Sequence, residues 1–386
     1  MSTIDVKYNE LGGSGGFLGA PTTAELVCPD GIGHYRHYQH GSIYWSQLTG
    51  AHEVHGLIRD KWAKLGWEKS FLGYPKTDES NSPVQNGKYN QFQGGTILWF
   101  AGSKEAFEVH GAIRNRWGQL NWESGILGFP LTDETKTPDG IGRFNHFQHG
   151  SIYWKPSISA HEIYGLIRQY WADHGWEKNP DLGYPITGEL ETSAGSKNRY
   201  NDFENGVLFW KYGNKQATPL SKLTINNASK TADEVMEEVK KFIVPKITAS
   251  DKIYISKGPY LESVTDYSFD GTTVHNRQYL IHIDLGADIP VLPDVSSNLK
   301  LWIEIAYDKK AKVINAILNK WWVHTNVPWP TSMGLSAEEV NEKFKATLNP
   351  LVGKKNKIAS IPDGINILSV KVMLNGDLNV YMEPIL

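Results

Sequence analysis

Two hydrophobic patterns alternate along the first 212 residues. Residues 35–45 form two short aromatic-rich runs on either side of Gly41. A glycine at the second position of a two-residue loop suits a tight turn with positive φ, so such runs predict β-hairpins. Between the hairpins, apolar residues recur at i, i+4 and i+8, as in Val54, Ile58 and Trp62. This second spacing predicts short helices.

Both patterns repeat with a period of about 55 residues. The tetrapeptide Leu-Gly-x-Pro begins at Leu18, Leu72, Leu127 and Leu182. The hairpins end in Trp45, Trp99, Trp154 and Trp210. The helical pattern occurs three times and stops at Gly66, Asn121 and Gly175, residue types that tolerate the left-handed conformation after a helix. A tryptophan follows each stop and is placed to fold back on the helix end. The sequence therefore predicts four hairpins alternating with three helices.

The alternation of side chains assigns each hairpin two faces. Pairing outward from the turn places Tyr38 opposite Ile43, and these residues share one face with the terminal tryptophan. This face is apolar in all four copies and is the predicted core face. The opposite face is polar and varies between copies, so it is either a solvated surface or a binding surface. Its candidate ligand contacts are His37, Tyr44, Gln91, His146, Tyr153 and Asp202.

Repeats this small cannot bury an apolar face alone, so neighbouring repeats must stack. The predicted fold is mostly β with short helices: a propeller-like ring or arc of four pseudo-symmetric repeats over residues 11–212, followed by an α+β domain over residues 220–386. In a closed ring the fourth helix position is open, and a helix of the second domain is a candidate to fill it. Charged residues recur beside the helical stripe, either as ligand contacts or as ion pairs between repeats. They are Glu53, Glu108, Glu162, Arg59, Arg114 and Arg168.

Composition separates the two domains and excludes several classes of protein. Residues beyond 212 carry Arg277 as their single arginine, and a short polar segment near residue 215 marks the boundary. The formal net charge of −3 gives no basic surplus for nucleic acid or an anionic membrane. Cys28 is the single cysteine, which excludes a disulfide framework and a cysteine-ligated metal cluster. No metal site and no cofactor are predicted.

No stretch approaches 18 apolar residues, and the first residues contain no apolar segment of a Sec-type signal. A cytoplasmic or non-classically exported protein is the expectation from this observation.

The repeat resembles the LGFP-repeat family over residues 11–212. Leu127-Gly128-Phe129-Pro130 spells the motif of the family, and the Glu-Val-His-Gly segment before it and the aromatic hairpin after it are also similar. The resemblance implies a flower-like module that occurs on extracellular bacterial proteins. Such modules are often joined to hydrolases or acyltransferases of the cell envelope. Their inferred role is attachment to envelope polysaccharide or peptidoglycan.

The second domain matches no recognised motif. A helix stopped by Pro245 and another that ends near Asn349 are predicted, together with strands over 277–285 and 299–307 and a hairpin over 369–382. Residues 311–323 fit either a helix or a strand. His282 and Asp284 share one strand face, Glu304 and Asp308 share another, and His275 is near in sequence. These groups are either an acid/base or metal site or solvated charges on a half-exposed sheet. No catalytic residue is assigned.

The predicted function is non-enzymatic carbohydrate binding by several weak, repeat-related sites, lectin-like or directed at cell-wall polysaccharide. Aromatic faces and planar polar groups on the hairpins supply the chemistry that sugars need. Two alternatives stay open. One is a glycan- or envelope-targeted hydrolase with its chemistry in residues 220–386. The other is a toxin or interaction protein whose second domain contacts lipid or protein.

Overall fold

The computed structural model describes residues 1–225, 234–248, 253–269, 272–274, 276–287, 295–326, 337–361, 364–373 and 377–384. The chain forms two compact units. The first comprises Met1–Leu190 with Gly213–Ala217, and the second comprises Glu191–Tyr212 with Thr218–Leu386. The fourth hairpin thus belongs to the second unit, whereas the sequence places the boundary near residue 215. None of the described helices is long and apolar enough to cross a membrane.

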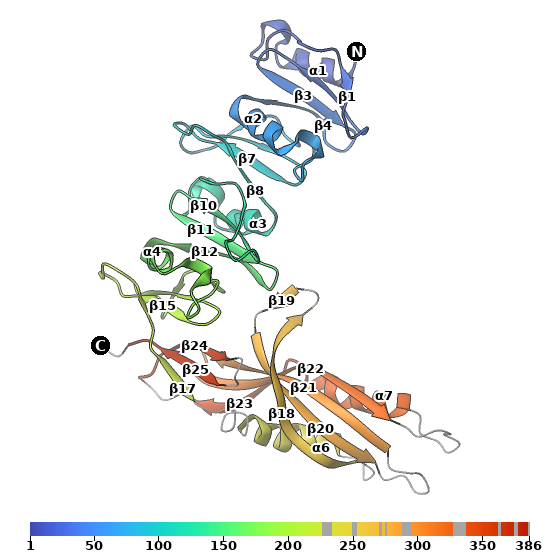
Figure 1. Cartoon of the computed structure of the whole chain (residues 1–386), viewed down its shortest axis with the longest axis vertical. Helices are drawn as coiled ribbons and strands as arrows, with labels where there is room; N and C mark the ends of the chain where they lie inside the picture. Colours follow the sequence, from blue (N-terminus) through green and yellow to red (C-terminus); the bar gives the residue numbers. More distant parts are fainter. Residues whose placement is uncertain are drawn as a thin grey trace. The chain divides into compact units, whose positions relative to one another are not determined.

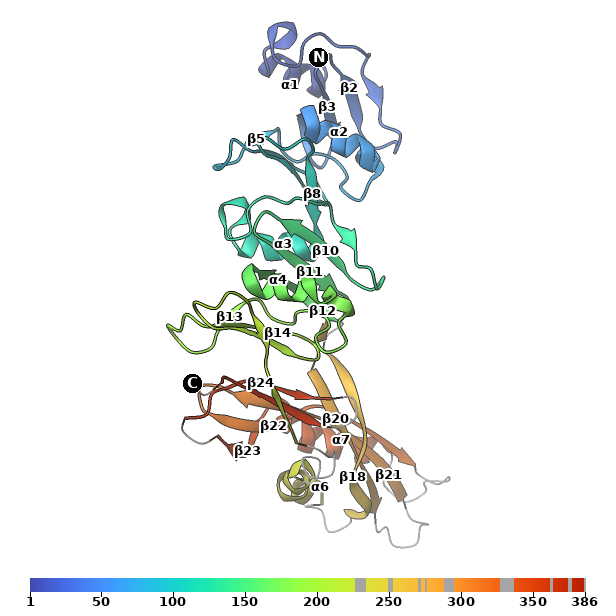
Figure 2. The same cartoon turned by 60° about the vertical axis from the view of Figure 1, so that its left-hand side comes forward.

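Residues 1–190 form alternating layers of helix and antiparallel sheet (Figures 1 and 2). The first sheet is β1 (Leu26–Val27), β2 (His34–His37), β3 (Gly41–Ser46) and β4 (Gly50–His55). The second sheet is β5 (Ser80–Asn81), β6 (Lys88–Gln91), β7 (Gly95–Trp99) and β8 (Phe107–His110). The third sheet is β9 (Thr135–Lys136), β10 (Arg143–Phe147), β11 (Gly150–Lys155) and β12 (Ile158–Tyr164). Each sheet keeps its strands in chain order.

Four α-helices accompany these sheets, one more than the sequence predicts. They are α1 (Thr3–Glu10), α2 (Gly56–Leu65), α3 (Gly111–Gln119) and α4 (Gly165–Asp173). Short 3₁₀ turns are η1 (Gly13–Gly15), η2 (Trp67–Lys69), η3 (Trp122–Ser124) and η4 (Trp176–Lys178). Helix α1 takes the fourth helix position, and its Ser2 capping box begins it. Ile4 is the buried residue of this helix, and its apolar stripe is too weak for periodicity to predict a helix here.

The hairpin register differs from the prediction by two residues. Tyr35 pairs with Tyr44 and Arg36 with Ile43, and the turn spans four residues that end at Gly41. A shift of two leaves every side chain on its predicted face, because side chains alternate with a period of two. Gly41 does not have a positive φ. Leu18 of the Leu-Gly-x-Pro segment packs where a Cβ of Gly41 would stand, 2.5 Å from its Cδ2.

The predicted helices begin later than the apolar stripe suggests. Val54 lies in β4, an additional strand that pairs with β3, and α2 begins at Gly56. Ile58 and Trp62 are buried on the helix as predicted. The predicted helix ends are confirmed, since Gly66 and Asn121 have φ of 106° and 70°.

Helices cover both faces of the first sheet. On the predicted core face, Tyr38 and Ile43 are buried, and Tyr8 of α1 stacks on Tyr38 with ring centres 4.6 Å apart. On the opposite face, Tyr44 contacts Trp62 of α2, with ring centres 4.6 Å apart. The core-face prediction is therefore confirmed, but the opposite face is also largely buried. The terminal tryptophans are half-buried: Trp45, Trp99, Trp154 and Trp210.

Ion pairs recur between successive layers. Lys7 Nζ of α1 lies 2.7 Å from Asp78 Oδ2, and Lys61 Nζ of α2 lies 2.7 Å from Asp133 Oδ2. Where Gly188 replaces the aspartate, Arg116 of α3 donates instead to both carboxylate oxygens of Glu162, at 2.6 and 2.9 Å. The interpretation of the recurring glutamates as inter-repeat ion pairs therefore holds for Glu162.

The described residues of the second unit form three antiparallel sheets. The first contains β13 (Leu190–Glu191), β14 (Arg199–Asp202), β15 (Val207–Trp210) and β16 (Thr218–Pro219). The second contains β17 (Lys222–Ile225), β25 (Leu378–Met382) and β24 (Ile367–Val372). The third contains, in spatial order, β19 (Thr272–Val274), β18 (Ile253–Phe269), β20 (Asn276–Ala287), β21 (Val295–Asp308), β22 (Val313–Asn326) and β23 (Lys355–Ser360). Residues 311–323 thus belong mostly to a strand.

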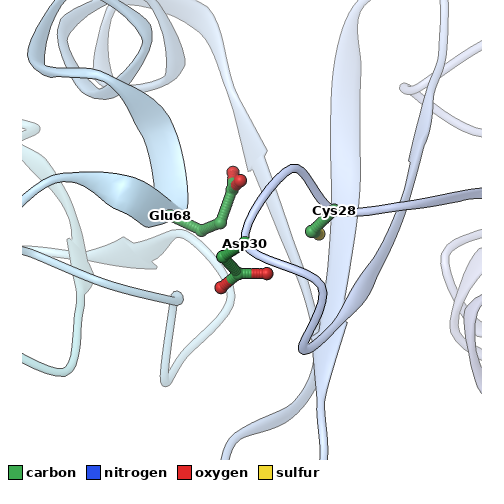
Figure 3. A group of neighbouring side chains, drawn as sticks. All are labelled: Cys28, Asp30 and Glu68. Atoms are coloured by element: carbon green, nitrogen blue, oxygen red, sulfur yellow. The ribbon is translucent and has the colours of Figure 1, made fainter.

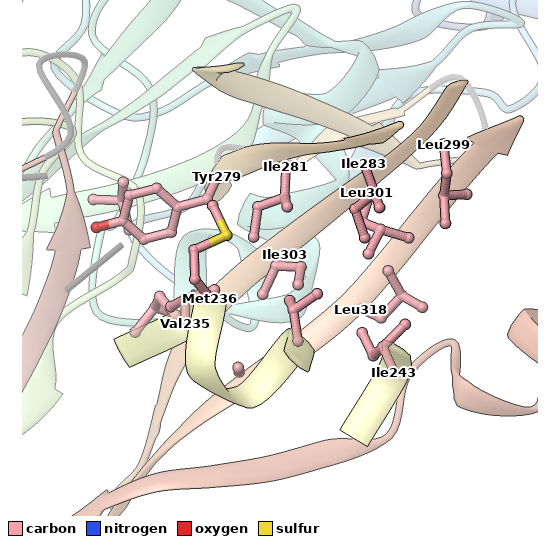
Figure 4. Packing of buried hydrophobic residues seen from close by; sticks show 14 of the residues in the cluster. Val235, Met236, Ile243, Tyr279, Ile281, Ile283, Leu299, Leu301, Ile303 and Leu318 are labelled. Atoms are coloured by element: carbon pink, nitrogen blue, oxygen red, sulfur yellow. The ribbon is translucent and has the colours of Figure 1, made fainter. Parts of the chain in front are cut away.

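Helical segments cover one face of the six-stranded sheet. They are η5 (Val239–Ile243, a π-type turn), α6 (Val244–Ile247), α7 (Ala337–Leu348) and η6 (Asn349–Leu351). Figure 4 shows Val235, Met236 and Ile243 packed against the strands. Their partners there include Tyr279, Ile281, Ile283, Leu299, Leu301, Ile303 and Leu318. Pro245 lies in the first turn of α6, directly after the π-type turn, rather than ending the helix.

The fourth hairpin packs on the hairpin β24–β25 within the second unit. Lys371 bonds to Asp202 and to the carbonyl of Phe203, and Tyr381 donates to the Asn205 carbonyl at 2.8 Å. Tyr200, Phe209, Leu368 and Tyr381 form part of one buried cluster. The polar, variable face of this hairpin is therefore a packing face.

Candidate functional site

An arginine site recurs in the first three repeats. In the first site, Arg59 Nε donates to Ser42 Oγ at 2.7 Å, and the guanidinium carbon lies 5.2 Å from the ring centre of Trp67. The second site has the same contacts in Thr96, Arg114 and Trp122, at 2.7 and 5.0 Å. The third site has them in Ser151, Arg168 and Trp176, at 2.7 and 5.2 Å. The helix presents the arginine, and the left-handed residue after it folds the tryptophan back beneath the guanidinium.

Neutral histidines complete the first and third sites. His37 Nδ1 lies 2.7 Å from Ser42 Oγ and 3.5 Å from Arg59 Nη2. His146 has the same contacts in the third site. Burial and then the charge of the neighbouring Arg168 lower the pKa of His146 to about 4, and burial and Arg59 lower that of His37. Both imidazoles are therefore hydrogen-bonding groups without charge at pH 7.

Stacked aromatic rings fill the space beside these two histidines. The Tyr44 ring lies between those of Tyr35 and Trp67, with centres 5.2 and 5.9 Å away. Tyr153 lies in the same way between Phe144 and Trp176, at 5.1 and 6.0 Å. Both tyrosines are 3% exposed. The expectation that these rings stack on a sugar is corrected, because the helix of the next layer already covers them.

The second site is open. Leu98 occupies the position of the buried tyrosine, and a cavity of about 260 Å³ lies beside it. The lining residues are Pro83, Tyr89, Gln91, Thr96, Leu98, Arg114, Trp117, Asn121, Trp122, Glu123 and Ser124. Trp122 is 37% exposed. A shorter side chain at one repeat position thus converts a filled aromatic stack into a cavity.

The guanidinium of Arg114 points to anion recognition in this cavity. Within residues 1–190, all of them described, Arg114 donates to Thr96 and stacks on Trp122 but makes no ion pair. Burial lowers the pKa of Arg114, although arginine keeps its proton in proteins. Glu123 also lines the cavity, and its Oε1 accepts the Ser82 hydroxyl at 2.6 Å. The remaining N–H groups of Arg114 are thus available to a ligand.

The structure distributes the six predicted contacts unevenly. Gln91 lines the cavity, and His37 and His146 lie half-buried at the equivalent positions. Tyr44 and Tyr153 are buried, and the Asp202 carboxylate bonds to Lys371. Arg114, which the sequence left open as a ligand contact or an ion-pair residue, also lines the cavity, and Trp122 and Tyr89 are additional members of the site. Their recurrence at the repeat period was the available signal, but only folding shows that the arginine and the tryptophan meet the hairpin face.

A second cluster of polar groups lies on the sheet of the second unit. His282 Nδ1 is 3.0 Å from the Tyr260 hydroxyl, and His282 Nε2 is 3.1 Å from Asp284 Oδ1. Glu262 lies 3.4 Å from the same imidazole and pairs with Lys300 at 2.6 Å. The structure thus brings His282 and Asp284 together as expected.

The other groups of that prediction lie apart from this cluster. Glu304 accepts from Asn319 at 2.7 Å, and Asp308 pairs with Lys355 at 3.1 Å. His275 lies outside the described residues. The candidate polar cluster therefore consists of Tyr260, Glu262, His282 and Asp284 with Lys300.

Comparison with known proteins identifies the repeats. The model of the LGFP repeat matches residues 18–70, 72–125, 127–179 and 182–224. No curated protein matches the sequence. Among solved structures, the complex of the fission yeast SREBP-SCAP binding domains is 10% identical, with 94% of this chain and 91% of that chain covered. Its TM-score of 0.14 is too low to support an argument about the fold. On the strength of the four matched repeats, which span more than half of its length, the chain belongs to the LGFP-repeat family.

Proposed function

We propose that this chain is a non-enzymatic carbohydrate-binding protein and that its second arginine site takes a sugar. The cavity of about 260 Å³ beside Leu98 carries this proposal. Its lining combines the aromatic rings of Tyr89 and Trp122 with the planar polar groups of Gln91 and Arg114. Sugars present apolar C–H surfaces and hydroxyl groups, and a lining of this kind complements both.

The guanidinium of Arg114 favours an acidic sugar. The Arg114 guanidinium has N–H donors left over after its bond to Thr96, and a carboxylate accepts from two such donors side by side. Polysaccharides of bacterial envelopes and peptidoglycan both carry carboxylates. The proposed ligand is therefore a carboxylate-bearing glycan, bound with its charge at Arg114 and its apolar surface beside the exposed part of Trp122.

The first and third sites support weaker, shallower contacts. Each retains the arginine, the tryptophan and a neutral histidine, but a buried tyrosine stands where the second site has Leu98. Weak sites on one chain raise the total affinity for a polymeric ligand, because binding at one site raises the local concentration at the others. In this proposal His37 and His146 bind sugar hydroxyls, whereas Gln91 does so inside the cavity.

Binding of the full chain to an array of neutral glycans, acidic glycans and murein fragments tests the proposal. Calorimetry on the best acidic oligosaccharide then compares the wild type with Leu98→Tyr, which restores the ring found in the other two sites. We expect binding to acidic glycans and its loss in this variant. The absence of binding to every glycan, or equal binding by Leu98→Tyr, contradicts the proposal.

A second candidate function is hydrolysis in the second unit. One observation favours it: His282 lies between the Tyr260 hydroxyl and the Asp284 carboxylate, the order in which a base activates a hydroxyl and is held by an acid. The test is esterase and amidase activity of the wild type, His282→Ala and Asp284→Ala, with and without a divalent metal. Activity that both variants lose supports this candidate, and its absence in the wild type removes it.

A further inference from the structure

A compact group of acidic side chains lies at the edge of the first sheet, away from the sugar cavity. Cys28 and Asp30 belong to the connection between β1 and β2, and Glu68 belongs to η2 (Figure 3). One ligand atom from each of the three lies within 4.8 Å of the others. The two segments are about 40 residues apart in sequence, so only the fold brings these groups together.

One carboxylate oxygen of Glu68 has no hydrogen-bond partner in the part of the chain that the structure describes. This oxygen is Oε1, and the residue is 6% exposed. A buried carboxylate oxygen without a donor is costly unless a cation or a donor compensates it. The Asp30 carboxylate is an acceptor and the Cys28 thiol is only a weak donor, so neither side chain compensates this oxygen well.

In the second repeat, the glutamate equivalent to Glu68 has a hydrogen-bond donor and no neighbouring aspartate. There Ser82 stands in place of Cys28 and donates to Glu123 at 2.6 Å, and Val84 replaces Asp30. In the third repeat Asp139 is present again, and its Thr137 neighbour donates to that aspartate at 2.7 Å. The glutamate of the third repeat, Glu177, then has both oxygens without a partner. The glutamate thus has an unpaired oxygen in the two repeats that carry the aspartate, and it is hydrogen-bonded in the repeat that lacks it.

We propose that Cys28, Asp30 and Glu68 form a binding site for one divalent transition metal of the Zn²⁺ class. A thiolate and two carboxylates are ligands that Zn²⁺ accepts, and a water completes four-coordination. Metal–ligand bonds of about 2.0–2.3 Å require small side-chain adjustments from the separations in the metal-free arrangement. Binding expels the thiol proton, so that the bound site carries the metal, a thiolate and two carboxylates.

A neighbouring side chain also fits a metal site at this position. The Tyr74 hydroxyl donates to Asp30 at 2.8 Å and orients that carboxylate as an outer-shell partner. A metal here links the β1–β2 connection to η2, and so links the first sheet to the layer that follows it.

Cobalt absorption of the full chain tests the site. Co²⁺ added to the chelator-treated protein is expected to give a thiolate-to-metal charge-transfer band at a stoichiometry of one, and Zn²⁺ is expected to abolish it. This band requires the thiolate, so Co²⁺ on surface histidines does not produce it. Wild-type protein without such a band overturns the proposal, whatever the variants do.

Variants assign the ligands. Cys28→Ser introduces the residue of the second repeat, and we expect the band to vanish; Glu68→Gln and Asp30→Asn should weaken Co²⁺ and Zn²⁺ binding by about 10–100-fold. Glu177→Gln changes the equivalent position of the third repeat, where no cysteine is present, and should leave Co²⁺ and Zn²⁺ binding unchanged. Zn²⁺ should also raise the melting temperature of the wild type but not of Cys28→Ser. Unchanged Zn²⁺ affinity in Cys28→Ser and Glu68→Gln contradicts this ligand set.

Discussion

Leu98 occupies in the second repeat the position that Tyr44 occupies in the first. Both side chains are buried, but the ring of Tyr44 is stacked between two aromatic rings, whereas Leu98 borders a cavity of about 260 Å³. The surrounding arginine, tryptophan and hydroxyl are common to both repeats. One substitution within a repeated frame therefore distinguishes a packing position from a candidate binding position.

Exchange of leucine and tyrosine at this repeat position should create a cavity in the third repeat and fill the one in the second. Tyr153→Leu deletes a buried ring in the third repeat, and we expect the free energy of unfolding to fall by about 2–4 kcal/mol because a cavity remains. Leu98→Tyr should leave the stability within about 1 kcal/mol, because the added ring enters existing space. Urea unfolding measures both variants. A large destabilisation by Leu98→Tyr indicates that this repeat cannot accommodate the stack.

Arg114 should set the preference for acidic ligands. Arg114→Gln retains a planar donor but removes the charge, so affinity for a carboxylate-bearing glycan should fall about 10–100-fold, while affinity for a neutral glycan should change little. Arg114→Lys keeps the charge but loses the paired donors, so its affinity for the acidic glycan should lie between those of the wild type and Arg114→Gln. Calorimetry with an acidic oligosaccharide and its reduced, neutral analogue measures the difference. Equal losses for both ligands show that Arg114 acts by packing.

Lys61 should stabilise the stacking of successive layers. Lys61 is 8% exposed, and its ammonium lies 2.7 Å from Asp133 Oδ2. The other carboxylate oxygen of Asp133 accepts the backbone N–H of Glu108 at 3.0 Å. Lys61→Met keeps the apolar stem but leaves the carboxylate without its cation, and we expect a loss of about 1–3 kcal/mol. Lys64→Met, on an exposed position of the same helix, is the matched control and should have little effect. Similar stability of the two variants argues against a role for the ion pair.

His110 should make stability fall as the pH rises above neutrality. Burial lowers its pKa, but hydrogen bonds and charge from Glu108 and Glu134 outweigh this and raise the pKa to about 9. An unfolded histidine titrates near 6.5, so the folded state holds an extra proton between about pH 6.5 and 9. The stabilisation is complete below that window and is lost through it, by about 1–3 kcal/mol.

His110→Tyr, which introduces the residue of the third repeat at Tyr164, should lower stability near pH 6 and flatten this slope. Urea unfolding at pH 6, 7.5 and 9 measures it. His55 forms the same kind of network with Glu53, and its pKa is also raised, so part of the slope should remain. An unchanged slope in His110→Tyr assigns the pH dependence to other groups.

Local pattern was sufficient for elements whose signal lies within one repeat. The hairpin faces, the buried Ile58 and Trp62, and the left-handed helix ends at Gly66 and Asn121 follow from periodicity and residue type. The pattern failed where a longer-range contact decides. Helix α1 has a weak stripe of its own and forms against the Tyr38 face, and Tyr44 is buried because α2 packs on a face that looks polar in sequence.

The candidate site was predicted only in part for the same reason. Gln91 was found because it varies on a hairpin face, whereas Arg114 and Trp122 lie on a different element and enter the site through tertiary packing. Asp202 looked equivalent to Gln91, yet Lys371, about 170 residues later, bonds to its carboxylate. Comparison of the repeats shows which residue types occur at a given position, but not which distant residue packs against it.

By itself, the order of residues determined the period, the alternation of hairpin and helix, and the family, because each depends on interactions within about 55 residues of chain. Only the tertiary structure decided which hairpin face stays open, where a cavity remains, and that Cys28 and Glu68 become neighbours. These outcomes depend on contacts between layers, and the free energy of such contacts depends on shape and burial that no local pattern of residues encodes.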